Sequence, residues 1–160
     1  MSLEFIVKHF RKKTKFGLRM GQNKNGMNDT SWCLISRARK SAEFLGHGDL
    51  SAAEIKKISD EIGEDEMFIF GSFNRKPKIV CLDSIILFLP IDEHGLEGMI
   101  FKNKIYQITG RTCETEYPLY DKQIEEYNKG KRNKDQIERV KMTDLTIERA
   151  RKIFWEFINS

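Results

Sequence analysis

The sequence has few of the residues that cross-link or interrupt small domains: it contains three cysteines and three prolines among 160 residues. Cys33, Cys81 and Cys113 are odd in number, widely spaced and without a C-x-x-C pair, a pattern that argues against a disulfide framework or a zinc site. We expect each of them to lie in the core as a small hydrophobe. This cysteine usage is typical of a reducing compartment, so the predicted location is cytoplasmic.

Long hydrophobic runs are also absent, since no stretch of about 18 apolar residues occurs and no membrane-spanning helix is predicted. Residues 1–10 include Glu4, Lys8 and His9 among their apolar residues, which does not match a secretory signal. We therefore expect no membrane partner. The 39% hydrophobic and 32% charged residues instead predict one ordinary globular domain or two very small ones.

Catalytic and metal-binding signatures are missing as well. His9, His47 and His94 are the only histidines, and none has a second histidine or a cysteine at i+3 or i+4. The sequence contains no glycine-rich phosphate loop and no G-x-S-x-G motif. No cofactor, metal or catalytic residue is therefore predicted, and the protein is expected not to be an enzyme.

One enzymatic alternative stays open, a small metal-dependent nuclease built from Asp83, Asp92 or Glu97, because Mg²⁺ needs only one or two carboxylates. Asp92, Glu93 and His94 also follow an apolar segment, where a general acid or base could lie. A site needs converging partners, however, and the sequence shows none for this cluster. A solvated polar loop is the simpler interpretation.

The clearest local pattern is a capped amphipathic helix at residues 51–62. Ser51 and Glu54 have the spacing of a capping box, and Leu50 and Ile55 that of a hydrophobic staple. Ile55, Ile58 and Ile62 fall at i, i+3 and i+7, so they share one buried face. Gly63 is predicted to end the helix in a left-handed conformation.

Three further segments predict that the first half of the chain is all helical. Residues 3–14 and 30–45 each combine an apolar stripe with a cationic side, as surface helices do. Residues 64–70 begin with three acidic residues, which favour a helix start by complementing the helix dipole.

The second half changes character after a turn at residues 71–77. Residues 79–89 predict one long strand or two short ones, and residues 98–108 predict a β-hairpin turning at Lys102-Asn103. Helices are predicted around Tyr120–Tyr127 and over the apolar face that ends the chain. The expected fold is α+β, with a helical N-terminal half, a small antiparallel sheet of about three strands, and C-terminal helices packing on it.

The expected organisation is a basic helical region at residues 1–72 and an α+β region at residues 73–160, which could pack as one domain. Positive charge is concentrated at the start. Residues 1–48 hold ten Lys/Arg against three acidic residues, whereas the other 112 residues hold 18 against 21. Such asymmetry indicates a polyanionic partner, although a solvated helix surface gives the same pattern.

Three segments resemble parts of the helix-turn-helix domains of the lambda-repressor (Xre) family, within residues 3–70. Ile35-Ser36-Arg37 is similar to the start of the segment after the recognition helix. Residues 50–63 and 65–68 look like that family's fourth and fifth helices. The resemblance implies DNA contacts at positions such as Thr30, Ser31, Arg37 or Arg39. The family's tight turn is replaced here by the loop at residues 21–29.

We therefore predict a nucleic-acid-binding protein, with duplex DNA as the favoured target, that regulates transcription for a phage or other mobile element. Lysines would contact phosphates, and arginines on the 30–45 segment would reach base edges. The assigned nucleic-acid-binding residues are Lys12, Lys13, Lys15, Arg19, Lys24, Arg37, Arg39 and Lys40.

Two other interpretations remain. A non-enzymatic inhibitor or accessory factor of phage or plasmid origin would bind a protein instead, and the replaced turn favours it. In the nucleic-acid interpretation as well, the C-terminal helix is expected to form a homodimer or partner surface, with Phe154, Trp155 and Phe157. Tyrosines near basic residues could alternatively stack single-stranded bases, although core packing is the simpler interpretation; these are Tyr106, Tyr117, Tyr120 and Tyr127, with Arg111, Lys131 and Arg132.

Overall fold

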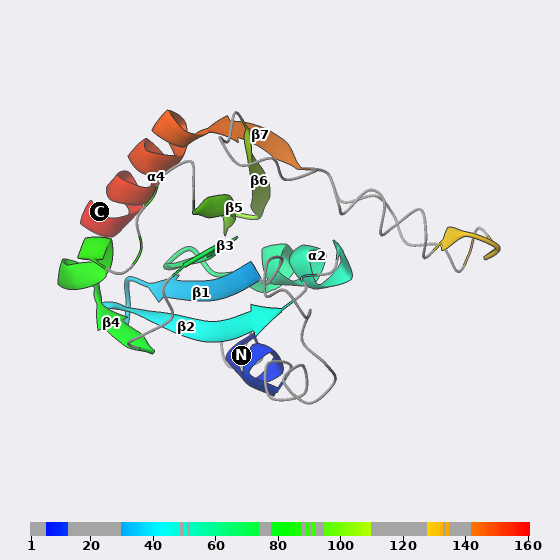
Figure 1. The fold of residues 1–160 in the computed structure, drawn as a ribbon, viewed down its shortest axis with the longest axis horizontal. Helices are drawn as coiled ribbons and strands as arrows, with labels where there is room; N and C mark the ends of the chain where they lie inside the picture. The colour runs from blue at the N-terminus through cyan, green and yellow to red at the C-terminus, as the bar shows by residue number, and fades with distance from the viewer. Residues whose placement is uncertain are drawn as a thin grey trace.

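The protein is described by a computed structural model, shown as a ribbon in Figure 1. It describes residues 6–12, 30–48, 50, 52–73, 78–87, 89, 91, 95–109, 128–132, 134 and 142–160. Within these residues no helix is long and apolar enough to cross a membrane. The features predicted at residues 16–20 and 21–29 and around Tyr120–Tyr127 lie outside this part of the chain.

A seven-stranded sheet in the order β4-β2-β1-β3-β5-β6-β7 forms the centre of the molecule. Neighbouring strands are antiparallel except for β6 and β7, which are parallel. Strands from both sides of residue 72 pair in this one sheet, since β2 pairs with β4 and β3 pairs with β5. The strands are β1 Thr30–Ser36, β2 Ser41–Gly48, β3 Glu66–Gly71, β4 Ile79–Cys81, β5 Leu96–Phe101, β6 Lys104–Thr109 and β7 Thr143–Thr146.

Helical segments cover both faces of the sheet. Residues 6–12 and α2 (Ala52–Glu61) share one hydrophobic cluster with Trp32, Leu34 and Phe68. The opposite cluster lies beneath α4 (Ile147–Asn159) and next to the 3₁₀ helix η1 (Leu82–Leu87). In Figure 1 the N-terminal helix (residues 6–12) lies below β1 and β2, and α4 lies above them at the upper left.

The predicted fold class was wrong, because the first half of the chain is not helical. The helix expected at residues 30–45 is the β1–β2 hairpin, and the helix expected at residues 64–70 is a turn followed by β3. The sheet is also larger than the three strands expected. The error at β1 has a physical cause: six consecutive residues of this strand are buried, from Ser31 to Ser36, and the four from Trp32 to Ile35 are apolar. A strand covered on both faces loses the period-two alternation that identifies a half-exposed one.

The hairpin turn holds the cations that were placed on the polar side of a helix. Lys40 has a positive φ of 54°, and its N–H donates to the Arg37 carbonyl at 3.1 Å. The Arg39 N–H donates to the Ser36 hydroxyl at 3.1 Å. The basic run 37–40 is therefore a tight turn at the end of two buried strands.

The amphipathic helix was predicted correctly. α2 spans Ala52–Glu61, and Ile55, Ile58 and Ile62 are buried. Gly63 differs from the prediction, because its φ is not in the left-handed region. A Cβ atom at Gly63 would lie 2.4 Å from the Glu66 carboxylate. The atoms that it would meet belong to the end of a flexible side chain, so this approach alone does not require glycine. The predicted cap at Ser51 lies outside the described residues.

The predicted hairpin and the final helix are also confirmed. β5 and β6 are joined at Lys102 and Asn103, whose φ values of 51° and 62° fit a primed two-residue turn. α4 is capped by Thr146, whose hydroxyl accepts from the Arg149 N–H at 3.3 Å. Residues 79–89 form less strand than expected: among those that the structure describes, only β4 is extended, and η1 follows it directly.

Candidate functional site

Two elements far apart in the sequence place cationic side chains around one hollow. Lys8 and Arg11 come from the N-terminal helix, and Arg39 comes from the β1–β2 turn. With Val7 they line a cavity of about 350 Å³. We call this the cationic hollow, defined by Val7, Lys8, Arg11 and Arg39.

The helix is held in place by its opposite side. Ile6 and Phe10 are buried at 2% and 1% exposure. The Phe10 ring lies 4.8 Å from the Trp32 ring and 5.4 Å from the Phe68 ring, measured between centroids. At 3.6 residues per turn, burying this side leaves Lys8 and Arg11 facing away from the aromatic cluster.

Arg11 is oriented by a carboxylate that is itself nearly buried. Its Nη2 group makes an ion pair with the Glu43 carboxylate, and Glu43 on β2 is only 9% exposed. The Arg11 side chain remains 46% exposed. Because one amino group is held by Glu43, the guanidinium has a defined orientation at the edge of the hollow.

Four cations at or next to the hollow have no partner among the described residues. In the part of the chain that the structure describes, the side chains of Lys8, Lys12, Arg39 and Lys40 make no hydrogen bond or ion pair. All four residues are exposed. The surface around the hollow therefore has an excess of positive charge.

The predicted nucleic-acid-binding residues have different outcomes. Lys12, Arg39 and Lys40 are exposed, and Arg39 lines the cationic hollow, while their contact with nucleic acid stays a prediction. Lys13, Lys15, Arg19 and Lys24 lie outside the described residues. The sequence-based list omitted Lys8 and Arg11, although their positions on the outer sides of the N-terminal helix were a usable signal.

Arg37 is occupied by contacts within the protein. Its Nη2 group donates to the Glu64 carbonyl at 3.0 Å and to the Asp65 carboxylate at 3.1 Å. Its Nη1 group donates to the Ser160 hydroxyl, and the guanidinium lies 4.5 Å from the centroid of the Phe157 ring. Arg37 therefore connects the β1–β2 turn with the end of α4.

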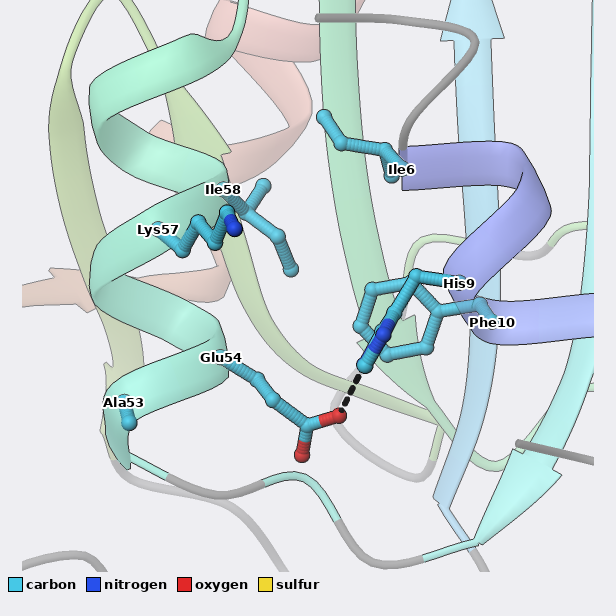
Figure 2. Close-up of a pocket in the computed structure, with 7 residues that line it drawn as sticks. All are labelled: Ile6, His9, Phe10, Ala53, Glu54, Lys57 and Ile58. Atoms are coloured by element: carbon cyan, nitrogen blue, oxygen red, sulfur yellow. Dashed lines mark hydrogen bonds and ion pairs between the residues drawn. The ribbon is translucent and has the colours of Figure 1, made fainter. Parts of the chain in front are cut away.

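A groove on the other side of the N-terminal helix is apolar. It has a volume of about 160 Å³ between this helix and α2, with Ile6, Phe10 and Ile58 among its lining residues. Figure 2 shows His9 and Glu54 meeting across it, and His9 Nε2 lies 2.8 Å from Glu54 Oε2. The His9 side chain is 42% exposed, so this contact is worth at most about 1 kcal/mol. It ties the two helices together.

A second basic segment lies at residues 128–134. Lys129, Lys131, Arg132 and Lys134 are exposed, and Gly130 has a φ of 77° that makes the turn. Figure 1 shows this segment well away from the sheet. Of the tyrosines considered for base stacking, Tyr106 is half-buried against the core, and the other three are outside the described residues.

The residues considered for a nuclease do not converge where the structure describes them. Asp83 is exposed on η1, and Glu97 accepts a hydrogen bond from the Thr30 hydroxyl at 3.1 Å. Asp92, Glu93 and His94 are not among the described residues. Across the described ranges, no group of three His, Cys, Asp or Glu residues is placed to hold a metal ion.

The C-terminal helix uses most of its apolar face internally. Phe154 and Phe157 are buried in the core beneath α4, so they are not the partner surface that the sequence suggested. Trp155 remains 38% exposed, and Ile79 and Leu87 are exposed on β4 and η1. A dimer or partner contact through α4 therefore depends on Trp155 alone among the three aromatic residues.

The two described cysteines differ in burial, so their reactivity can test the placement of β1. Burial, and secondarily the charge of Glu43, raises the pKa of the Cys33 thiol well above its usual range. Cys81 is exposed on β4, contrary to the expectation that every cysteine is buried, and Cys113 lies outside the described residues.

Because the thiolate is the reactive form and a buried thiol reacts only through opening of the structure, we expect iodoacetamide to modify Cys81 at least about 100-fold faster than Cys33 at pH 8. Peptide mass spectrometry would measure both rates. In urea the two rates should converge, and equal rates in the native protein would contradict this placement of β1.

Comparison with known proteins gives no match: no family model, curated protein or solved structure is significantly similar to this chain.

Proposed function

We propose that this protein binds nucleic acid through the phosphate backbone, using the surface around the cationic hollow. The observation that supports the proposal is the convergence of Lys8, Arg11 and Arg39 from two elements, with Lys12 and Lys40 exposed nearby. Cations that are not neutralised within the protein are the groups that displace counterions from nucleic acid.

The proposed mode of binding differs from that of a recognition helix. The cations assigned to a groove-binding helix belong to a hairpin turn, and Arg37 is engaged in internal contacts. Phosphate contacts position a protein on nucleic acid without reading its sequence. The proposal therefore covers nucleic acid as a class, with duplex DNA as the first probe. Transcriptional regulation, origin in a mobile element and a cytoplasmic location remain predictions from the sequence.

Fluorescence anisotropy with labelled duplex DNA, single-stranded DNA and RNA across a salt series tests the proposal. We expect binding that weakens steeply with salt, by a slope of about −0.9 for each phosphate neutralised on duplex DNA. Arg39→Gln should weaken binding to all sequences alike and reduce the magnitude of that slope by about 1.

The matched control is Lys152→Gln, which removes one exposed charge from α4 on the opposite face of the sheet. It should leave the slope unchanged. Absence of binding at about 50 mM salt, where phosphate contacts are strong, would contradict the proposal and favour the alternative of a protein-binding factor. An equal loss from Lys152→Gln would instead show that net charge, and not this surface, determines binding.

A further inference from the structure

The cationic hollow is an open recess in the basic surface. A cavity of about 350 Å³ falls within the range of small-ligand pockets, roughly 300–1,000 Å³. Phosphates within a duplex lie along a convex backbone, which protruding side chains such as Lys12 and Lys40 can reach. A recess with cations around it is better matched to a charged group that projects from the end of a strand.

We propose that the cationic hollow binds a phosphate monoester, the phosphorylated end of a nucleic-acid strand. This inference rests on the proposed function and adds a specific ligand to the same surface. A terminal monoester has a charge of about −1.5 to −2 at pH 7, whereas each internal phosphodiester has a single negative charge.

The charge of the site favours the monoester. Among the described residues, Lys8, Arg11 and Arg39 contribute three positive charges, and Glu43 behind Arg11 contributes one negative charge. A lining with this excess of positive charge attracts a doubly charged monoester more strongly than a singly charged internal phosphodiester.

Glu43 is assigned a positioning role. A guanidinium has five N–H donors in a fixed fork, and Glu43 engages one of its amino groups. The remaining donors of Arg11 then keep a fixed direction, which suits the tetrahedral oxygens of a phosphate. Lys8 from the N-terminal helix and Arg39 from the β1–β2 turn would complete the site.

The test compares two oligonucleotides of identical sequence, one with a 5′-phosphate and one with a 5′-hydroxyl group, in competition anisotropy at fixed salt. We expect the phosphorylated strand to bind about tenfold more tightly, a gain typical of added charge-assisted hydrogen bonds. Arg39→Gln and Lys8→Gln should each reduce this ratio to about twofold or less, and Lys152→Gln should leave it unchanged.

Glu43→Gln separates positioning from folding. If Glu43 orients Arg11, the affinity ratio for phosphorylated over hydroxyl ends should fall, even though this substitution removes a negative charge next to the site. A purely structural role would change stability without changing the ratio. Arg39 lies on an exposed turn, so the Arg39→Gln variant should fold. This variant still tests the proposal if Glu43→Gln does not fold.

Each outcome bears on a different proposal. Equal affinity for the two strands, with steep salt dependence, would overturn the monoester inference and leave backbone binding in place. A nucleoside monophosphate that competes with the phosphorylated strand only would support the site and show that the monoester itself is recognised. Binding of a phosphoserine peptide without binding of either oligonucleotide would overturn both proposals.

Discussion

Arg37→Ala is expected to lower the free energy of unfolding by about 2 to 4 kcal/mol, since it removes charged hydrogen bonds and a cation–π contact. It should leave the nucleic-acid affinity of the folded protein unchanged. This is the opposite of the role that the sequence predicted for Arg37, which was contact with a base. In the structure Arg37 stabilises the fold instead, because its guanidinium connects three separate parts of the chain.

The contacts of Arg37 explain why the effect is on stability. Glu64 and Asp65 precede β3, and Phe157 and Ser160 lie at the end of α4. The Arg37 side chain is 24% exposed, so most of it is removed from water. Truncation would leave the Glu64 carbonyl and the Asp65 carboxylate without this donor and would uncover the Phe157 ring.

Urea unfolding and anisotropy on the same samples would check both parts of this prediction. Arg37→Lys keeps the charge but lacks the fork of donors, so it should also destabilise the protein. Arg39→Ala is the matched control, because it removes the same side chain from the same turn. We expect it to weaken binding with little change in stability. A binding defect in Arg37→Ala at full folding would restore the original assignment.

The sequence predicted those elements in which local pattern and final environment agree. α2 has one buried face, so its isoleucines at helical spacing identified it correctly. The Lys102-Asn103 turn needs two residues with positive φ, a requirement that local chemistry expresses directly. α4 likewise packs a single apolar face on the sheet, with Phe154 and Phe157 buried and Trp155 partly exposed.

The central strands could not be identified in the same way, because their pattern depends on what covers the sheet. Met67, Phe68, Ile69 and Phe70 are all buried in β3, so the run has no alternation. The acidic residues before β3 have the pattern of a helix start, but they form a turn. Long-range pairing of β1 with both β2 and β3 decides the structure of these segments, and no local window contains it.

The candidate site also depends on long-range contacts that the sequence does not show. The excess of basic residues in residues 1–48 was visible in the sequence, and the lining of the cationic hollow comes from this region. Which cations meet was not visible, because Lys8 and Arg39 are brought together only by the docking of the N-terminal helix on the sheet. The internal role of Arg37 depends on α4, more than 100 positions away in the chain.

The dependence of the cationic hollow on this docking leads to a second large effect. Phe10→Ala is expected to lower the free energy of unfolding by about 3 to 5 kcal/mol, the usual cost of truncating a buried phenylalanine. It should also weaken the binding of nucleic acid at temperatures where the protein is still folded. Phe10 is 1% exposed and contacts the rings of Trp32 and Phe68, so it is the anchor of the helix that presents Lys8 and Arg11.

Phe154→Ala is the matched control for this prediction. Phe154 is 0% exposed in the cluster on the opposite face of the sheet, so its truncation should have a similar cost in stability. It does not contribute to the docking of the N-terminal helix, and it should leave binding unchanged in the folded protein. Urea unfolding, followed by anisotropy at a temperature where both variants are folded, separates the two effects. If both variants lost affinity equally, binding would follow global stability, and the cationic hollow would not be the site. A loss confined to Phe10→Ala would mean that the surface is assembled by one aromatic contact between the helix and the sheet.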